Sequence, residues 1–301
     1  MKKEKRQSSG LTSKFNLFDI CLYIFMFLFM ITVLYPFWDL LMRSFSAPES
    51  AGQVGFALLP SKFSLGSYRA VFTGGNIGTN YFNTIFRTAV GTILSLLVTS
   101  LCAFGLAQKE LPFRSGITFF LVFTMFFGGG MIPSYLLVKG LGLIDSIWAL
   151  ILPGLANVYN MIMLRNYMQS IDKSMEESAM LDGANQFTIL FRIIFPVCKP
   201  ILATVALWLM VGHWNAWFDA MLYTNKPGLE VLQLALQKML QTSNSLEYIK
   251  YQVVAGDGSS TFTTESLQAA QIFVSIVPIL CAYPFLQKYF VKGIMVGSFK
   301  G

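Results

Sequence analysis

Six stretches of this chain are apolar over about the length needed to cross a lipid bilayer. The hydrocarbon core of a bilayer is about 30 Å thick, so a helix that rises about 1.5 Å per residue needs roughly 20 apolar residues. In lipid, the backbone N–H and C=O groups must form hydrogen bonds within the spanning segment, which favours helices. The sequence also lacks the segments of about ten residues with alternating hydrophobicity that form a membrane β-barrel. The sequence therefore predicts an all-α membrane protein with six transmembrane helices, near residues 20–42, 84–107, 116–138, 146–164, 198–222 and 267–287.

The composition agrees with a surface that mostly faces lipid or protein. Charged residues make up only 12% of the chain, whereas a soluble domain carries about 25%. The net charge of +7 fits cytoplasmic loops rich in Lys and Arg better than nucleic-acid binding. The four cysteines lack the spacing of a metal site, and we interpret them as small apolar side chains: Cys21, Cys102, Cys198 and Cys281.

The basic residues predict how the chain is oriented in the cell membrane. With the N-terminus in the cytoplasm, most of the 22 Lys and Arg residues fall in the cytoplasmic segments, which favours cytoplasmic N- and C-termini. The first apolar segment is uncharged from Ile20 to Trp38, and this is longer than the apolar region of about 7–15 residues in a signal peptide. We therefore expect a multi-pass protein with an uncleaved first span.

A polar segment between the fourth and fifth spans, residues 172–196, carries the signals of two short helices. Ser174 followed by Glu177 fits a capping box at a helix start. Gly183 stands where a helix of two turns would end, and Pro196 is expected to stop the second helix. These residues alone leave two interpretations open. They form either a helical hairpin with a solvated acidic face or a stiff elbow in which Glu177 binds a basic residue of a partner.

The same segment resembles the EAA loop of ATP-binding-cassette importer permeases. That pattern is Glu-Ala-Ala, three residues, Gly, nine residues, Ile, one residue, Leu and Pro. Here Ser178 replaces the first Ala and Phe195 replaces Leu. We call residues 172–196 the EAA loop. In this family an ATPase subunit binds the membrane subunit at this loop. The resemblance therefore implies that the loop couples the ATPase to the membrane spans through Glu176, Glu177, Ser178, Ala179, Asp182, Gly183, Ile193 and Pro196.

Segments outside the EAA loop extend the resemblance over nearly the whole chain. Phe18-Asp19-Ile20, with Tyr35-Pro36-Phe37, is similar to the branch that handles complex oligosaccharides and uronic-acid polysaccharide fragments. Five further segments are similar to carbohydrate-uptake permeases of the maltose-transporter type: 131–143, 148–153, 164–167, Trp214-Asn215 and 287–293.

This resemblance implies a type I importer permease fold and a defined assembly. A second, homologous permease completes the pathway, two ATPase subunits bind ATP and Mg, and an extracytoplasmic solute-binding protein delivers an oligosaccharide. The implied division of the chain is a cytoplasmic N-terminal tail (1–18), a six-helix permease domain (19–291) and a cytoplasmic C-terminal tail (292–301) that also reaches the ATPase.

The chain itself carries no sign of an enzyme site. It lacks a GxxxxGK[ST] phosphate loop and any catalytic or metal-ligand constellation, so we expect no catalysis, metal or cofactor in this subunit. The lone His213 is interpreted as a structural or pathway residue. A secondary transporter would need ionisable residues at mid-membrane, and Asp39 and Asp219 lie toward span ends. That alternative, a membrane-embedded enzyme and a structural scaffold are all disfavoured.

Aromatic and amide residues of the fourth and fifth spans are candidates for the sugar path, because sugars are commonly held by ring stacking and hydrogen bonds. The alternative is packing or an interfacial aromatic belt, above all for Trp217. The candidates are Tyr159, Asn160, Trp208, Trp214, Asn215 and Trp217. Two long external segments, 43–83 and 223–266, are either surface loops or docking sites for an external partner. The second contains an amphipathic stretch, 229–240, and favours docking.

Overall fold

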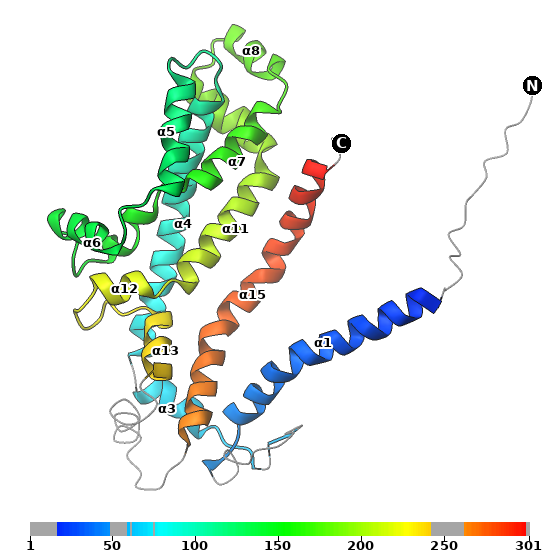
Figure 1. Ribbon diagram of the computed structural model, residues 1–301, viewed down its shortest axis with the longest axis vertical. Helices are drawn as coiled ribbons and strands as arrows, with labels where there is room; N and C mark the ends of the chain where they lie inside the picture. The colour runs from blue at the N-terminus through cyan, green and yellow to red at the C-terminus, as the bar shows by residue number, and fades with distance from the viewer. Residues whose placement is uncertain (1–16, 49–58, 61, 75, 242–261, 299–301) are drawn as a thin grey trace, which may run out of the picture.

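The computed structural model describes residues 17–48, 59–60, 62–74, 76–241 and 262–298. Within these ranges the chain is helical, apart from loops and an isolated antiparallel bridge between Ser46 and Phe63. The helices form an elongated bundle (Figure 1). They are α1 (Leu17–Ser44), α3 (Gly66–Gly74), α4 (Ile77–Ala107), α5 (Arg114–Phe126), α6 (Met131–Gly140), η1 (Ile147–Leu150), η2 (Leu152–Gly154), α7 (Val158–Gln169), α8 (Ser174–Leu181), α9 (Gln186–Thr188), η3 (Ile189–Ile194), α10 (Phe195–Val197), α11 (Lys199–Asn215), α12 (Phe218–Tyr223), α13 (Leu232–Gln241) and α15 (Thr264–Ser298).

The helices supply up to six membrane spans among the described residues. α1, α4 and the first part of α15 are each long and apolar enough to cross a membrane alone. The other three candidates are bent pairs, and the total reaches six where each pair is one broken span. α5 and α6 meet at 114°, the 3₁₀ turns η1 and η2 meet α7 at 48°, and the run Gln186–Val197 meets α11 at 87°.

The predicted span over 116–138 is not one continuous helix. Gly128, Gly129 and Gly130 separate α5 from α6, because successive glycines lose much backbone entropy in a helix. Gly130 also adopts φ +84°, a region that favours glycine. α6 therefore projects sideways from the bundle (Figure 1). Other boundaries differ as well. α4 begins at Ile77 rather than near 84, α11 ends at Asn215 before a separate α12, and α15 continues to Ser298 rather than ending near 287.

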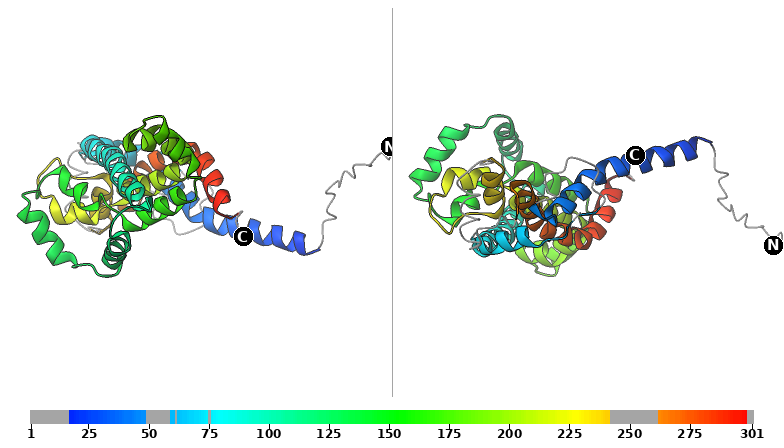
Figure 2. Two further views of the ribbon diagram at one scale, coloured as in Figure 1. Left: turned by 90° about the horizontal axis from the view of Figure 1, so that it is seen from above. Right: turned by 90° about the horizontal axis from the view of Figure 1, so that it is seen from below.

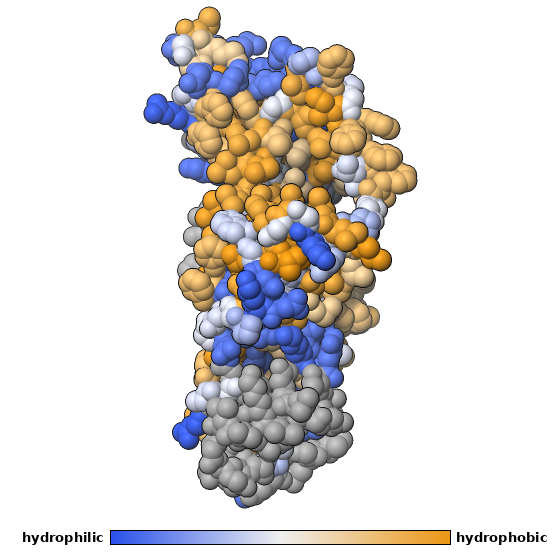
Figure 3. Space-filling model, turned by 90° about the vertical axis from the view of Figure 1, so that its left-hand side faces the viewer, coloured by the Kyte–Doolittle hydropathy of each residue, from blue (hydrophilic) through white to orange (hydrophobic). Residues whose placement is uncertain are grey.

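Helix α1 extends away from the bundle, and its main contact is with α15 (Figures 1 and 2). No residue of its apolar window is buried; Phe25, Leu28 and Phe29 are examples of its exposed side chains. On the bundle itself, a broad apolar zone lies beside more polar patches (Figure 3). Apolar surface of this extent is suited to lipid or to another membrane subunit rather than to water.

Helix α4 forms the centre of the bundle and packs against α7 and α11. Ala103, Leu164 and Val205, one from each helix, belong to a shared buried cluster. The imidazole of His213 on α11 lies so close to α4 that a Cβ atom on Gly91 would come within 2.7 Å of it. Small residues allow membrane helices to approach closely in this way, and His213 therefore fills a helix–helix contact.

A second cluster closes the end of the bundle that lies away from α8. Val71, Trp214, Leu232 and Leu267 are among its buried members. The predicted amphipathic stretch 229–240 corresponds to α13, whose buried residues include Leu232, Leu234 and Met239. Residues 242–261 of the same predicted external segment lie outside the described residues.

The predicted tails are described only in part. Residues 1–16 and 299–301 lie outside the described residues. Helix α15 continues to Ser298, so the predicted start of a C-terminal tail at residue 292 falls within a helix. The division into tails and a permease domain stays a prediction.

Candidate coupling site and transport path

The EAA loop begins with α8, whose first turn carries Glu176 and Glu177. The predicted capping box is wrong, because the N-cap residue is Lys173 and Ser174 is the first residue of the helix. The side chain that meets this helix start belongs to Asp172: its Oδ1 accepts a hydrogen bond from the Ser174 N–H at 3.0 Å, and a carboxylate is a stronger acceptor than a hydroxyl. This backbone bond holds the pKa of Asp172 below its ordinary value, so a charged carboxylate remains beside the positive end of the helix dipole.

Helix α8 ends in a Schellman turn. The Gly183 N–H donates to the Met180 carbonyl at 3.0 Å, and the Ala184 N–H donates to the Ala179 carbonyl at 2.9 Å. Gly183 has φ +82°, which residues with a Cβ atom rarely adopt. The prediction that Gly183 ends this helix is confirmed.

The second limb of the loop is one helical run through α9, η3 and α10. Asn185 caps its start by accepting the Thr188 N–H at 2.8 Å, and residues 189–194 form a π-helical turn. The limb ends at Val197, one residue after Pro196, so the predicted stop is confirmed to within one residue. Because Pro196 has no N–H to donate, it cannot continue the hydrogen-bond ladder of the preceding turn. The Cys198 N–H still bonds to the Ile194 carbonyl at 2.8 Å, and the bend follows between Val197 and Lys199.

The EAA loop is anchored to the bundle at both limbs. Ile189, Leu190 and Ile194 are buried in the cluster shared with α4, α7 and α11. Gln108, the C-cap residue of α4, donates from its Nε2 to the Glu176 Oε2 at 3.2 Å. The loop is therefore packed against the spanning helices and bonded to the end of α4. Closely packed interiors transmit displacement rather than absorb it.

The tip of the EAA loop presents acidic and apolar side chains together, and Figure 1 shows α8 at one extreme of the molecule. Leu181 is 89% exposed and Phe187 is 67% exposed. Glu177 and Asp182 are exposed, whereas Ala179 is half-buried. Large apolar side chains that project into solvent beside carboxylates are suited to a contact with another protein.

Two of the predicted path residues lie together. Tyr159 is near the start of α7 and Trp208 is in α11, with ring centroids 6.1 Å apart and planes inclined by 32°. Tyr159 is 57% exposed and Trp208 is 39% exposed. The pair therefore offers ring surface from two adjacent spans.

The other four candidates have different surroundings. Trp214 is 6% exposed, and its Nε1 donates to the Ser275 carbonyl at 3.2 Å, so it offers no free ring face. Asn160 is buried in the first turn of α7. Asn215 is exposed where α11 ends, and Trp217 is half-buried with its ring edge-on to Phe218 at 5.7 Å.

Comparison with known proteins decides the family. Residues 70–296 match the sequence model of a protein family described as binding-protein-dependent transport system inner membrane component. The chain belongs to this family. It is 39% identical to the polygalacturonan/rhamnogalacturonan transport system permease protein YtcP of Bacillus subtilis (strain 168), over 96% of this chain and 100% of the relative. It is 36% identical to Protein LplC of the same organism, over 95% of this chain and 96% of the relative.

A solved structure agrees with the family assignment. The permease matches a chain in the crystal structure of a bacterial ABC transporter involved in the import of the acidic polysaccharide alginate. The TM-score is 0.86 and the sequence identity 32%, and the match covers 93% of this chain and 100% of the other. The predicted importer permease fold is confirmed. The protein is a membrane transport component and not itself an enzyme.

Several residues of the permease's EAA loop were missed in the sequence. Asn185 is a preferred N-cap type three residues before Thr188, a signal that was present. Leu181 and Phe187 are apolar residues in a polar segment. Gln108, outside the loop, directly follows α4 but meets Glu176 only in space, 68 residues away in sequence. Within the described part of the chain, no three His, Cys, Asp or Glu side chains gather as a metal site.

Proposed function

We propose that this permease is one of two homologous membrane subunits of an ATP-driven importer for oligosaccharides or polysaccharide fragments. The EAA loop carries the proposal, because an anchored elbow with exposed Leu181 and Glu177 is suited to a moving partner. Two ATPase subunits would bind ATP and Mg and drive the motion by ATP hydrolysis, and an extracytoplasmic solute-binding protein would deliver the cargo. The similarity to the polygalacturonan/rhamnogalacturonan permease YtcP and to the alginate importer supports a saccharide as the cargo, and favours one that carries carboxylates.

The proposed coupling works through rigid contacts. Closure of the ATPase dimer moves α8, with Glu177 bound to a basic residue of the ATPase and Leu181 seated in its surface. Because Glu176 is bonded to Gln108 and Ile194 is packed in the bundle, the motion reaches α4, α7 and α11. These helices then rock between inward-facing and outward-facing states.

In this proposal the α8 end of the bundle lies in the cytoplasm, together with both termini. The opposite end, with α3, α12 and α13, faces the binding protein through segments 43–83 and 223–266. Tyr159 and Trp208 are the best placed of the path candidates, since both rings are exposed. Asn215 is an exposed amide at the outer end of the same span.

The test is ATP hydrolysis by the assembled importer in lipid nanodiscs. Binding protein loaded with oligosaccharide is expected to stimulate hydrolysis several-fold over unloaded binding protein. Glu177→Lys should abolish the stimulation without changing the amount of assembled permease, because the side chain is exposed. Glu110→Lys is the matched control at the same end, since this residue lies outside the EAA loop and its 3.9 Å ion pair with Lys173 is exposed and worth little. Equal hydrolysis with every loaded and unloaded binding protein would contradict the proposal.

A further inference from the structure

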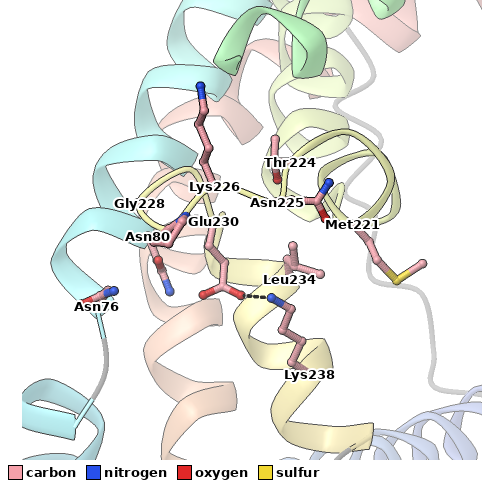
Figure 4. A pocket seen from close by; sticks show the side chains of 11 residues that line it. Asn76, Asn80, Met221, Thr224, Asn225, Lys226, Gly228, Glu230, Leu234 and Lys238 are labelled. Carbon is pink, nitrogen blue, oxygen red and sulfur yellow. Dashed lines mark hydrogen bonds and ion pairs between the residues drawn. The ribbon is translucent and has the colours of Figure 1, made fainter. Parts of the chain in front are cut away.

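A polar pocket of about 510 Å³ opens at the end of the permease away from the EAA loop (Figure 4). Its volume is in the range of small-molecule sites, about 300–1,000 Å³. Four elements contribute to it: the start of α4, the end of α12, the loop from Thr224 to Glu230, and α13. Its lining residues are Asn76, Asn80, Met221, Thr224, Asn225, Lys226, Pro227, Gly228, Glu230, Leu234 and Lys238.

The loop that forms one wall of the pocket is held on two sides by side chains distant in sequence. Asn83 of α4 donates from its Nδ2 to the carbonyls of Gly228 and Glu230, at 2.8 and 2.9 Å. Asp145 accepts at its Oδ1 from the N–H groups of Asn225 and Lys226, at 2.5 and 3.0 Å. The hydrogen bond from Asn225 is the main cause that lowers the pKa of Asp145, so this clamp stays charged at neutral pH.

The start of α13 is fixed in the same way. The Thr84 hydroxyl of α4 accepts the Leu232 N–H at 2.8 Å. The amide nitrogen of Asn80, in the orientation that satisfies its neighbours, lies 3.2 Å from the Asn76 carbonyl and 3.3 Å from the Glu230 carbonyl. The wall is thus preorganised, and a rigid site loses less free energy to ordering when a ligand binds.

The charges of the pocket are arranged unequally. Glu230 and Lys238 neutralise each other in an ion pair of 2.7 Å. Lys226 extends from the loop away from that pair (Figure 4). It forms no ion pair within 4 Å in the described part of the chain, although its charge, after the backbone hydrogen bonds, also helps to lower the pKa of Asp145. Asn76 and Asn225 are exposed at the rim. The pocket thus offers amides, a hydroxyl and one ammonium group that is directed away from Asn76 and Asn225 (Figure 4). This set matches an extended ligand that carries a carboxylate and many hydroxyls.

We propose that this pocket is a binding subsite for uronate-containing oligosaccharides, occupied as they pass from the binding protein to the membrane path. The inference rests on the proposed function and adds a location and a recognition group to it. Lys226 binds the carboxylate of a uronate residue, and the amides of Asn76 and Asn225 bind hydroxyls. Neutral sugars of the same size lack the charge-assisted contact and bind more weakly.

The experiment measures direct binding to the complete importer in nanodiscs without binding protein, by ligand-observed NMR titration. The probes are trigalacturonate and its carboxyl-reduced, uncharged counterpart. Lys226→Gln is expected to raise the Kd for trigalacturonate about five- to tenfold and to change the Kd for the reduced probe less than twofold. Lys226→Arg should retain most of the affinity. Lys139→Gln, an exposed lysine outside the pocket, is the control for net charge and should bind like the wild type.

A second variant tests the pocket itself. Asn76→Trp places a large ring at an exposed rim position and should weaken binding of both probes. Wild-type affinity for trigalacturonate in both Lys226→Gln and Asn76→Trp would overturn the inference, as would an absence of binding to the wild type. Neither result would affect the proposed function, provided that loaded binding protein still stimulates ATP hydrolysis. Loss of that stimulation in the wild type is the separate result that contradicts the proposed function.

Discussion

Arg87 of α4 and Asp219 of α12 form an ion pair inside the bundle. Arg87 is 3% exposed, and its Nη1 also donates to the Ala216 carbonyl at 3.0 Å. The pair thus fixes the elbow between α11 and α12, near the exposed amide of Asn215. A charge in the membrane is costly and is kept only when it is paired or functional. Here the pairing gives it a structural role.

Removal of one member of this pair should destabilise the importer. Arg87→Met leaves Asp219 without its partner, and breaking a buried pair costs about 3–5 kcal/mol. Because Asp219 is 30% exposed, we expect the lower part of that range or less. Thermal unfolding of the purified complex should show a reduced midpoint for Arg87→Met and a milder change for Arg87→Met with Asp219→Leu. Arg69→Met, at an exposed position of α3, should leave the midpoint unchanged. Equal midpoints for Arg69→Met and Arg87→Met would refute a stabilising role.

The contact between Gly91 and His213 predicts a rescue. A Cβ at residue 91 would lie 2.7 Å from the His213 ring, so Gly91→Ala must displace the ring or separate α4 from α11. We expect less assembled importer in the membrane, measured by quantitative gel filtration. Gly91→Ala with His213→Ala should restore assembly, because the obstructing ring is then absent. If the double variant assembles no better than Gly91→Ala, the steric explanation fails.

The turn of the EAA loop predicts a loss of coupling without loss of assembly. Gly183→Ala forces an alanine into φ +82°, which costs roughly 1–2 kcal/mol and should shift the orientation of the second limb. We expect uptake of radiolabelled oligosaccharide into proteoliposomes to fall several-fold at unchanged protein content. Gly105→Ala is the matched control, since a Cβ at Gly105 meets no atom within 4 Å and its backbone is not left-handed. Wild-type uptake by Gly183→Ala would show that the turn is not needed for coupling.

The helical fold was predictable because membrane-spanning helices can be recognised in a sequence as apolar segments of about 20 residues. Breaks within spans were less predictable, as the three glycines at 128–130 show. A lone glycine is tolerated in a membrane helix, and the number needed to break one depends on the neighbouring packing. The residue pattern also placed the turn at Gly183 correctly, because few residues accept its backbone conformation.

The parts of the site that escaped prediction depend on contacts between segments distant in sequence. Lys173 rather than Ser174 is the N-cap residue of α8, and the Asp172 carboxylate accepts the Ser174 N–H. The residue types alone do not select this arrangement. Gln108 meets Glu176 only after α4 and the EAA loop have packed. Trp214 looked like a path residue, but its indole N–H bonds to the Ser275 carbonyl on α15. No local pattern distinguishes a buried tryptophan from an exposed one.

The most direct test places a photoreactive benzoylphenylalanine at Leu181, the 89% exposed apolar residue at the tip of the EAA loop, in the complete importer. Irradiation should produce a covalent adduct with the ATPase subunit, and its yield should change when ATP is added. The same group at Phe72, an exposed residue of α3 at the opposite end, should produce no ATPase adduct. An adduct with the ATPase from position 72 but not from position 181 would contradict the account.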